Sequence, residues 1–282
     1  MREFLTYTLK ISRFRFWIYT GGTYVVGYAL GMNSWLDLLR LEYFLYLLYF
    51  FIPANIFIYG VNDYWDRETD RRNPKKDEKE QRVTKKNEET LLRLLYVVFG
   101  LSLVLLIFQS DMAERLIFSS FLLLSYFYSA EPFRFKAIPI VDFMSNMLYV
   151  VPGIFGYYLA ANHLPPFLYL IAGFTHIAAM HLFSAIPDIK YDKEANITTT
   201  AVILKKTASL IVCFIFWSIL AILVIYLAGF HPLSFLVFIY PAIPGTLLVK
   251  KNLSIEKVYW TLPLINTSLG GLLFVIIVLS AI

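Results

Sequence analysis

An apolar run leads directly into an acidic cluster in the stretch Pro53-Ala54-Asn55-Ile56-Phe57-Ile58-Tyr59-Gly60-Val61-Asn62-Asp63-Tyr64-Trp65-Asp66-Arg67-Glu68-Thr69-Asp70. A carboxylate at the end of a membrane-spanning run is costly unless a cation compensates it. Asn62, Asp66 and Asp70 recur at every fourth residue, so a helix that continued through them would place them on one face. The stretch therefore predicts a membrane helix with a cation-binding face at its end.

A second acidic cluster follows another apolar run, at residues 188–194. Asp188 and Asp192 repeat the four-residue spacing of the first cluster. Facing pairs of carboxylates suit Mg²⁺, a hard cation that takes oxygen ligands and often shares them with substrate phosphates. We expect metal ligands at Asn62, Asp63, Asp66, Asp70, Asp188 and Asp192.

The composition is that of an integral membrane protein. The 282 residues are 59% hydrophobic and only 16% charged, whereas a soluble domain carries about a quarter charged residues. Mean hydropathy is +0.63. Apolar segments close to the length of a membrane span recur along the chain. We predict an all-α membrane protein, one domain over residues 1–282, with nine transmembrane helices around a central cavity, at 14–32, 42–61, 90–109, 113–130, 137–161, 166–187, 207–229, 232–249 and 257–281.

The basic residues predict the orientation of these helices. Of the 25 Lys and Arg residues, 22 fall on the side that holds the N-terminus and both acidic clusters. This asymmetry places that side in the cytoplasm and the C-terminus on the opposite side. We expect cytoplasmic polar loops at about 62–89, 131–136 and 188–206. Contact with anionic lipid explains the net charge of +5, and no nucleic-acid partner is needed.

Polar side chains also extend from the acidic clusters back into the apolar runs. Asn55 and Tyr59 lie on the line that leads to the first cluster, and His181 and Ser184 lead to the second. Such residues either form hydrogen bonds between helices or line a cavity. Asp142 and Asn146 are one helical turn apart, and Asp142 could cap a helix, line the cavity or act as a base.

Cations occur in a third segment, which runs from Tyr128 to Lys136. Arg134 and Lys136 could complete a diphosphate site, Arg through forked hydrogen bonds and Lys as a point charge. Taken alone, they are ordinary positive residues at the cytoplasmic face of a membrane. Residues 71–89 could likewise form a lid over the site or a solvated loop.

These motifs resemble those of the UbiA superfamily of membrane prenyltransferases. Asn62, Asp63, Asp66 and Asp70 match its Asn-Asp-x-x-Asp-x-x-x-Asp signature. The second Asp-x-x-x-Asp signature is matched in the 188–194 cluster, and residues 128–136 match the Tyr-Ser-x-x-x-x-Arg-x-Lys element. Within the superfamily, residues 53–63, 73–76 and 181–188 resemble the lycopene elongase/hydratase group.

The resemblance implies a UbiA-like bundle, Mg²⁺ as cofactor, a prenyl diphosphate donor and a lipophilic acceptor. Asp66, Asp70, Asp188 and Asp192 would then be the catalytic metal ligands. The diphosphate would be bound by Asn62, Arg134, Lys136 and Lys190. The acceptor or the cavity would involve Asn55, Tyr59, Tyr128, Asp142, Asn146, His181 and Ser184, although Ser184 stands where some relatives carry a further Asp.

The expected reaction is Mg²⁺-dependent transfer of a dimethylallyl group to a carotenoid such as lycopene. One alternative is prenylation of an aromatic quinone precursor or another lipid. A non-enzymatic alternative is a transporter or ion-binding membrane protein. A transporter is expected to place acidic residues near the membrane midplane, whereas here they gather at one face. The sequence leaves the oligomeric state open.

Overall fold

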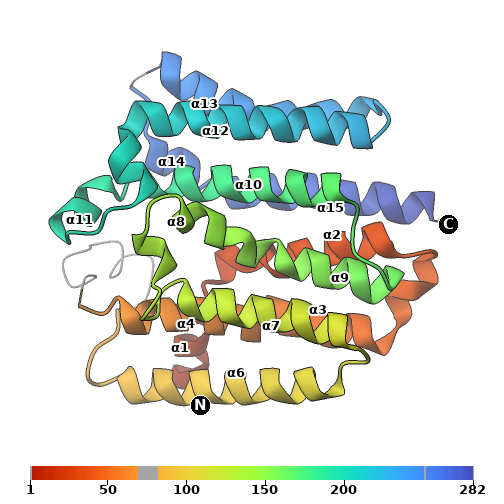
Figure 1. Cartoon of the computed structure of the whole chain (residues 1–282), viewed down its shortest axis with the longest axis horizontal. Coiled ribbons are helices and arrows are strands. Elements are labelled where there is room, and N and C mark those ends of the chain that lie inside the picture. The colour runs from red at the N-terminus through yellow and green to blue at the C-terminus, as the bar shows by residue number, and fades with distance from the viewer. Residues whose placement is uncertain (1, 69–81, 251, 282) are drawn as a thin grey trace. The chain divides into compact units, whose positions relative to one another are not determined.

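The chain is helical throughout the part that the computed structural model describes, namely residues 2–68, 82–250 and 252–281 (Figure 1). In these ranges every regular element is an α-helix or a 3₁₀-helix, which confirms the all-α prediction. The chain divides into two compact units. The first contains Met1–Arg134, Val151–Leu164 and Leu273–Ile282, and the second contains Phe135–Val150 and Pro165–Leu272.

The first unit contains α1 (Arg2–Ser12), η1 (Phe14–Tyr19), α2 (Gly21–Gly31), η2 (Trp35–Leu39), α3 (Leu41–Phe51), α4 (Pro53–Trp65), α6 (Glu88–Phe108), α7 (Met112–Phe127) and α9 (Val151–Ala161). The second unit contains η4 (Phe135–Ala137), α8 (Val141–Met144), η5 (Ser145–Tyr149), α10 (Phe167–Ala185), α11 (Ile189–Glu194), α12 (Thr200–Leu227), η6 (Pro232–Phe238), α13 (Ile239–Val249), α14 (Ile255–Tyr259) and most of α15 (Leu262–Ser280). Here η denotes a 3₁₀-helix.

In the described ranges, six helical stretches are long and apolar enough to cross a membrane. They are Leu41–Trp65, Glu88–Phe108, Phe167–Ala185, Thr200–Leu227, Pro232–Val249 and Ile255–Ser280, and they match six of the nine predicted spans. The prediction of nine long helices is not confirmed, because the other three segments are short or broken.

The three remaining segments differ in how they depart from a long helix. Segment 14–32 is divided between η1 and α2, and segment 113–130 corresponds to α7, which has only 16 residues. Segment 137–161 is distributed over η4, α8, η5 and α9. Pro139 and Pro152 fall in that last segment, and proline cannot donate the backbone hydrogen bond that a continuous helix requires.

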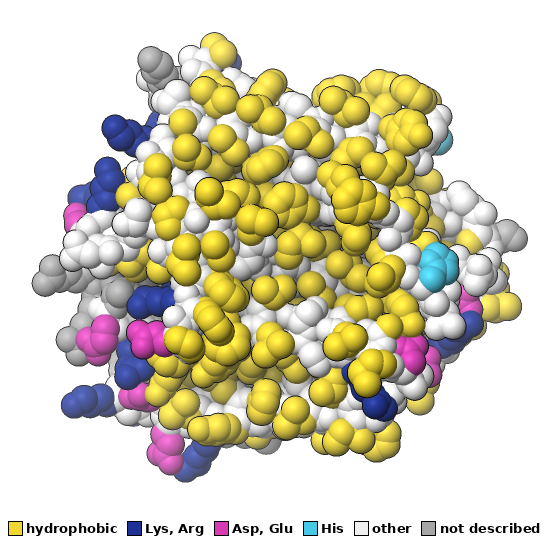
Figure 2. Space-filling model, viewed as in Figure 1, with side chains coloured by type: hydrophobic (Ala, Val, Ile, Leu, Met, Phe, Trp, Pro, Cys, Tyr) yellow, Lys and Arg dark blue, Asp and Glu magenta, His cyan; other side chains and the backbone are white. Residues whose placement is uncertain are grey.

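The long helices expose much of their apolar surface. Only 28% of the apolar window of α6 and 17% of that of the stretch Ile255–Ser280 is buried. Large side chains of α6, among them Tyr96, Ile107 and Phe108, are more than two-thirds exposed. The face seen in Figure 2 is covered mostly by hydrophobic side chains. A soluble protein rarely presents such a surface, so these helices are suited to contact with lipid.

Small residues allow α2 and α9 to pack closely in the first unit (Figure 1). A Cβ atom added to Gly27 would lie 2.0 Å from the carbonyl oxygen of Gly153, and one added to Gly31 would lie 2.5 Å from that of Tyr157. Close backbone contact of this kind stabilises helix pairs in membranes, where lipid competes for apolar side chains. The absence of side chains at Gly27 and Gly31 therefore allows the backbones of α2 and α9 to approach closely.

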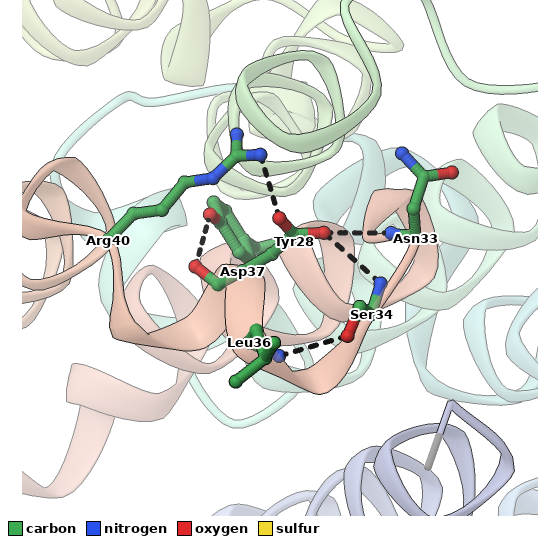
Figure 3. Close-up of polar contacts among 6 residues, drawn as sticks. All are labelled: Tyr28, Asn33, Ser34, Leu36, Asp37 and Arg40. Atoms are coloured by element: carbon green, nitrogen blue, oxygen red, sulfur yellow. Dashed lines mark hydrogen bonds and ion pairs between the residues drawn. The ribbon is translucent and has the colours of Figure 1, made fainter.

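A polar turn joins α2 to α3 and is organised around Asp37 (Figure 3). Its Oδ2 accepts hydrogen bonds from the backbone N–H groups of Asn33, at 2.9 Å, and Ser34, at 3.2 Å. Its Oδ1 pairs with Arg40 Nη2 at 2.7 Å, and Tyr28 donates its hydroxyl to the Asp37 carbonyl at 2.8 Å. A single carboxylate thus satisfies the backbone donors of a tight turn between two apolar helices.

The Gly27→Ala variant tests the close packing of α2 against α9. We expect it to be about 1–3 kcal/mol less stable than wild type, because the added methyl group overpacks the contact. Gly100→Ala in α6 is the matched control, since nothing lies within 4 Å of its added Cβ. Thermal unfolding in detergent measures both variants. Equal melting temperatures for the two would contradict the packing described here.

Candidate functional site

The first acidic cluster begins where α4 ends. The helix stops at Trp65, and Asp66 is its C-cap, so the expected continuous helix through Asp66 is not formed. Asn62 Nδ2 donates to Asp66 Oδ2 and to Ser129 Oγ, each at 2.9 Å. Both bonds use the amide nitrogen of Asn62, which leaves its amide oxygen as the atom that could bind a cation. Asp70 lies outside the described residues.

Arg134 approaches the same carboxylate from the loop that follows α7. Its Nη2 lies 3.2 Å from Asp66 Oδ1, and the two side chains are 25% and 11% exposed. Asp66 therefore accepts an amide hydrogen bond on one oxygen and pairs with a guanidinium on the other. Arg134 therefore lies beside the first acidic cluster in this structure. A partly exposed guanidinium can also bind a phosphate group. Phosphate, like carboxylate, accepts two parallel charge-assisted hydrogen bonds from arginine.

Asp63 points to a different set of partners. Arg13 Nη2 lies 2.6 Å from Asp63 Oδ1, and Asp63 is only 2% exposed. The Arg13 guanidinium also lies over the Tyr59 ring, 4.6 Å from its centroid. Burial, with the Asp63 charge as the second cause, raises the pKa of Tyr7 to about 12. This buried ion pair joins the turn between α1 and η1 to α4, and it favours a structural role for Asp63 over the expected metal ligation.

Asn55 forms hydrogen bonds between helical segments, which is one of the two roles considered for it. Its Nδ2 donates to the carbonyl oxygens of Phe50 and Phe51, each at 2.9 Å, and to Thr20 Oγ1 at 2.7 Å. The residue is fully buried. Pro53 starts α4 and has no N–H group, so the helix is interrupted there. Asn55 supplies hydrogen bonds to carbonyl groups at the end of α3.

The second acidic cluster lies in the second unit, on the short helix α11. Asp188 is the N-cap of α11 and Asp192 follows one turn later. The predicted continuous line from His181 through Ser184 to Asp188 is broken, because α10 ends at Ala185 and Pro187 cannot continue it. Ser184 Oγ donates to the His181 carbonyl of its own helix at 2.7 Å. The two aspartates are thus carried by α11.

Asp142 binds the backbone at the start of α12, near that cluster. Helix capping is one of the roles expected for it. The residue is 1% exposed. Its carboxylate accepts hydrogen bonds from the Thr200 backbone N–H at 2.7 Å and the Thr200 hydroxyl at 2.6 Å. Asn146, also buried, donates its side-chain amide to the Asp142 carbonyl at 2.6 Å. These bonds account for Asp142 and Asn146 without a substrate.

The remaining predicted residues occupy varied environments. Tyr59 is buried beneath Arg13, Tyr128 is half-buried at the C-terminal end of α7, and His181 is half-buried on α10. Lys136 is half-buried in η4, and Lys190 is exposed on α11. Within the described ranges, no group of three His, Cys, Asp or Glu side chains lies close enough to bind a metal by itself.

Four residues that contact the candidate site side chains were not predicted from the sequence: Arg13 beside Asp63, Ser129 beside Asn62, Thr199 beside Asp192 and Thr200 beside Asp142. Arg13 is 50 residues from Asp63 and carries no local signal for that pairing. Ser129 and the two threonines lie in segments 128–136 and 188–206, which also contain predicted site residues. Closeness in sequence to those residues was the only signal available for them.

Comparison with known proteins identifies the family. The model of the UbiA prenyltransferase family matches residues 21–255. This chain belongs to the UbiA prenyltransferase family. It is therefore an enzyme that transfers a prenyl group, and its apolar helices are those of an integral membrane protein.

Relatives of this UbiA protein include two lycopene elongase/hydratases. That of Haloferax volcanii is 36% identical over 95% of this chain and 87% of its own length. That of Halobacterium salinarum is 33% identical over 94% of each chain. A UbiA homolog from Archaeoglobus fulgidus, solved with GPP and Mg²⁺, has the same fold, with a TM-score of 0.72 and 22% identity over 96% of this chain and 99% of its own.

The Arg13–Asp63 pair of this UbiA protein can be tested by a double-mutant cycle. Asp63→Ala should cost about 3–5 kcal/mol of stability, because it removes the ion-pair partner of a largely buried guanidinium. The double variant Arg13→Met/Asp63→Ala should regain much of that loss, since neither charge then remains. Thermal unfolding of the wild type, Arg13→Met, Asp63→Ala and the double variant gives the coupling energy.

If Asp63→Ala did not destabilise the protein, Asp63 would again be a candidate metal ligand. In that case Asp63→Ala would keep the wild-type melting temperature and would require a higher Mg²⁺ concentration for activity. Glu89→Ala is a suitable control for loss of an acidic side chain, because Glu89 belongs to an exposed pair with Arg93 on α6.

Proposed function

We propose that this UbiA-type prenyltransferase transfers a dimethylallyl group from its diphosphate to a carotenoid acceptor such as lycopene. Three relatives named lycopene elongase/hydratase support the choice of acceptor, at 33–36% identity over 94–95% of this chain. The arrangement that carries the donor half of the proposal is the Asp66 carboxylate, placed between the Asn62 amide and the Arg134 guanidinium.

Mg²⁺ is the proposed cofactor, and the donor set fits it. Carboxylate and amide oxygens are hard ligands that suit this cation. Asp66 and Asp70 of the first cluster and Asp188 and Asp192 of the second would hold it, and Asn62 would add its amide oxygen. When bound, Mg²⁺ acts as a Lewis acid and stabilises the negative charge that develops on the departing diphosphate.

Basic side chains bind the diphosphate in this proposal. Arg134 can exchange its 3.2 Å contact with Asp66 for a forked contact with phosphate oxygens once the carboxylate binds a cation. Lys136 and Lys190 contribute as point charges. These residues stabilise the leaving group, which must accept the electron pair of the breaking C–O bond.

The carbon chemistry follows from ionisation of the donor. The C–O bond breaks and the diphosphate leaves with both electrons, which produces an allylic cation. The π electrons of a terminal double bond of the acceptor then form the new C–C bond and leave a tertiary cation. That cation ends by losing a proton, or by adding water and releasing a proton. Tyr128, His181 and Ser184 remain the proposed residues for the acceptor side.

The membrane topology belongs to the same proposal. The whole chain would form one prenyltransferase domain with nine membrane crossings, three of them made by the short or broken segments 14–32, 113–130 and 137–161. The distribution of Lys and Arg supports a cytoplasmic N-terminus, cytoplasmic acidic clusters and a C-terminus on the other side. The active-site loops would then meet a water-soluble donor, and the acceptor would come from the bilayer.

Expression in a lycopene-producing host that supplies dimethylallyl diphosphate tests the proposal. Mass spectrometry of the pigments should detect products longer by one or two isoprene units. Asp66→Ala should remove at least 99% of these products because it removes a cation ligand. Glu89→Ala, which loses an exposed acidic residue at the start of α6, should retain them.

Two outcomes would change the assignment. Unchanged lycopene with folded wild-type protein in the membrane would remove the carotenoid acceptor and direct the search to aromatic quinone precursors. Full activity of a folded Asp66→Ala protein would instead contradict the metal assignment of the first cluster.

A further inference from the structure

The turn between α11 and α12 connects Asp192 to the first residues of α12. Asn196 adopts a positive φ of 56°, and the Ile197 N–H donates to the Asp192 carbonyl at 2.8 Å. Thr199 Oγ1 then donates to Asp192 Oδ2 at 3.2 Å and accepts a hydrogen bond from the Val202 N–H at 3.3 Å. A hydroxyl group has one hydrogen to donate. In this arrangement Thr199 uses it on the carboxylate while its oxygen caps α12.

Thr200, the next residue, is held by several short hydrogen bonds. Asp142 accepts from both the backbone N–H and the hydroxyl of Thr200, at 2.7 Å and 2.6 Å. The Ile140 N–H donates to the same hydroxyl oxygen at 2.6 Å, and the Phe143 N–H donates to Asp142 Oδ1 at 2.9 Å. Asp142 and Thr200 are 1% and 7% exposed. These bonds fasten the start of α12 to the segment that contains α8.

Three consecutive threonines therefore have different environments. Thr198 is exposed, whereas Thr199 and Thr200 are buried. Thr200 forms a clamp with Asp142, and Thr199 reaches the carboxylate of the second acidic cluster. We infer that Thr199 is a positioning residue that orients Asp192 for cation binding, and that the Asp142–Thr200 clamp holds Thr199 in place. This inference rests on the proposed function, in which Asp192 binds Mg²⁺.

The physical reason is the cost of orienting a ligand when the cation binds. A hydrogen bond from Thr199 fixes one oxygen of Asp192 and hence the plane of its carboxylate. Carboxylates that bind metals are commonly held by such hydrogen bonds, and their loss weakens metal affinity about 10–100-fold. Asp192 is only partly buried, on a helix of six residues, so the hydrogen bond from Thr199 can influence the orientation of its carboxylate.

Mn²⁺ binding measured by electron paramagnetic resonance tests this inference without a catalytic assay. The purified protein in detergent is titrated with Mn²⁺ in the presence of inorganic diphosphate. Thr199→Val, which keeps the shape of the side chain and removes its hydroxyl, should weaken Mn²⁺ binding about tenfold or more. Thr198→Val is the matched control and should bind as wild type does. Thr199→Ser restores the hydroxyl and should restore binding.

A further variant separates positioning from helix capping. Glycine is nearly as favourable as threonine at a helix N-cap. Thr199→Gly should therefore keep the melting temperature within about two degrees of wild type and still lose Mn²⁺ affinity. Wild-type affinity in folded Thr199→Gly would overturn the positioning role alone. Absence of Mn²⁺ binding in the wild-type protein would contradict the proposed metal site and this inference with it.

Discussion

The structure depends on one electrostatic constraint: carboxylates beside apolar helices need a specific partner. Burial of an unpaired charge costs several kcal/mol, and each acidic group described here avoids that cost in its own way. Asp63 pairs with Arg13, and Asp66 pairs with Arg134. Asp142 accepts backbone and hydroxyl hydrogen bonds. The partners differ in how easily a cation or a phosphate could replace them, and this difference separates structural carboxylates from candidate ligands.

The positions at which α4 and α10 end show which features of the site could be predicted from the sequence. The four-residue spacing predicted Asp66 and Asp192 as cation ligands at the ends of apolar runs. It placed them on continuous helices, which was wrong, because α4 ends at Trp65 and α10 ends at Ala185, shortly before Pro187. The partner of Asp63 was unpredictable, since a contact 50 residues away in the chain leaves no local pattern.

The fold was predictable to the extent that hydropathy alone determines it. Six expected spans correspond to long apolar helical stretches, because helical structure satisfies the backbone of about 20 apolar residues in lipid. Three of these stretches are divided between two helices: Leu41–Trp65, Pro232–Val249 and Ile255–Ser280. The segments 14–32 and 137–161 were not predicted correctly, since they break into short and 3₁₀ helices that hydropathy does not detect. Family membership, by contrast, was evident from the two acidic motifs and is confirmed by the match over residues 21–255.

The central proposal is that each acidic cluster is needed for Mg²⁺-dependent binding of diphosphate. Isothermal titration of inorganic diphosphate into the purified protein, with and without Mg²⁺, tests it most directly. The account predicts binding that requires Mg²⁺ and that is lost both in Asp66→Asn and in Asp192→Asn. Mg²⁺-independent binding, or wild-type affinity in either folded variant, would contradict it.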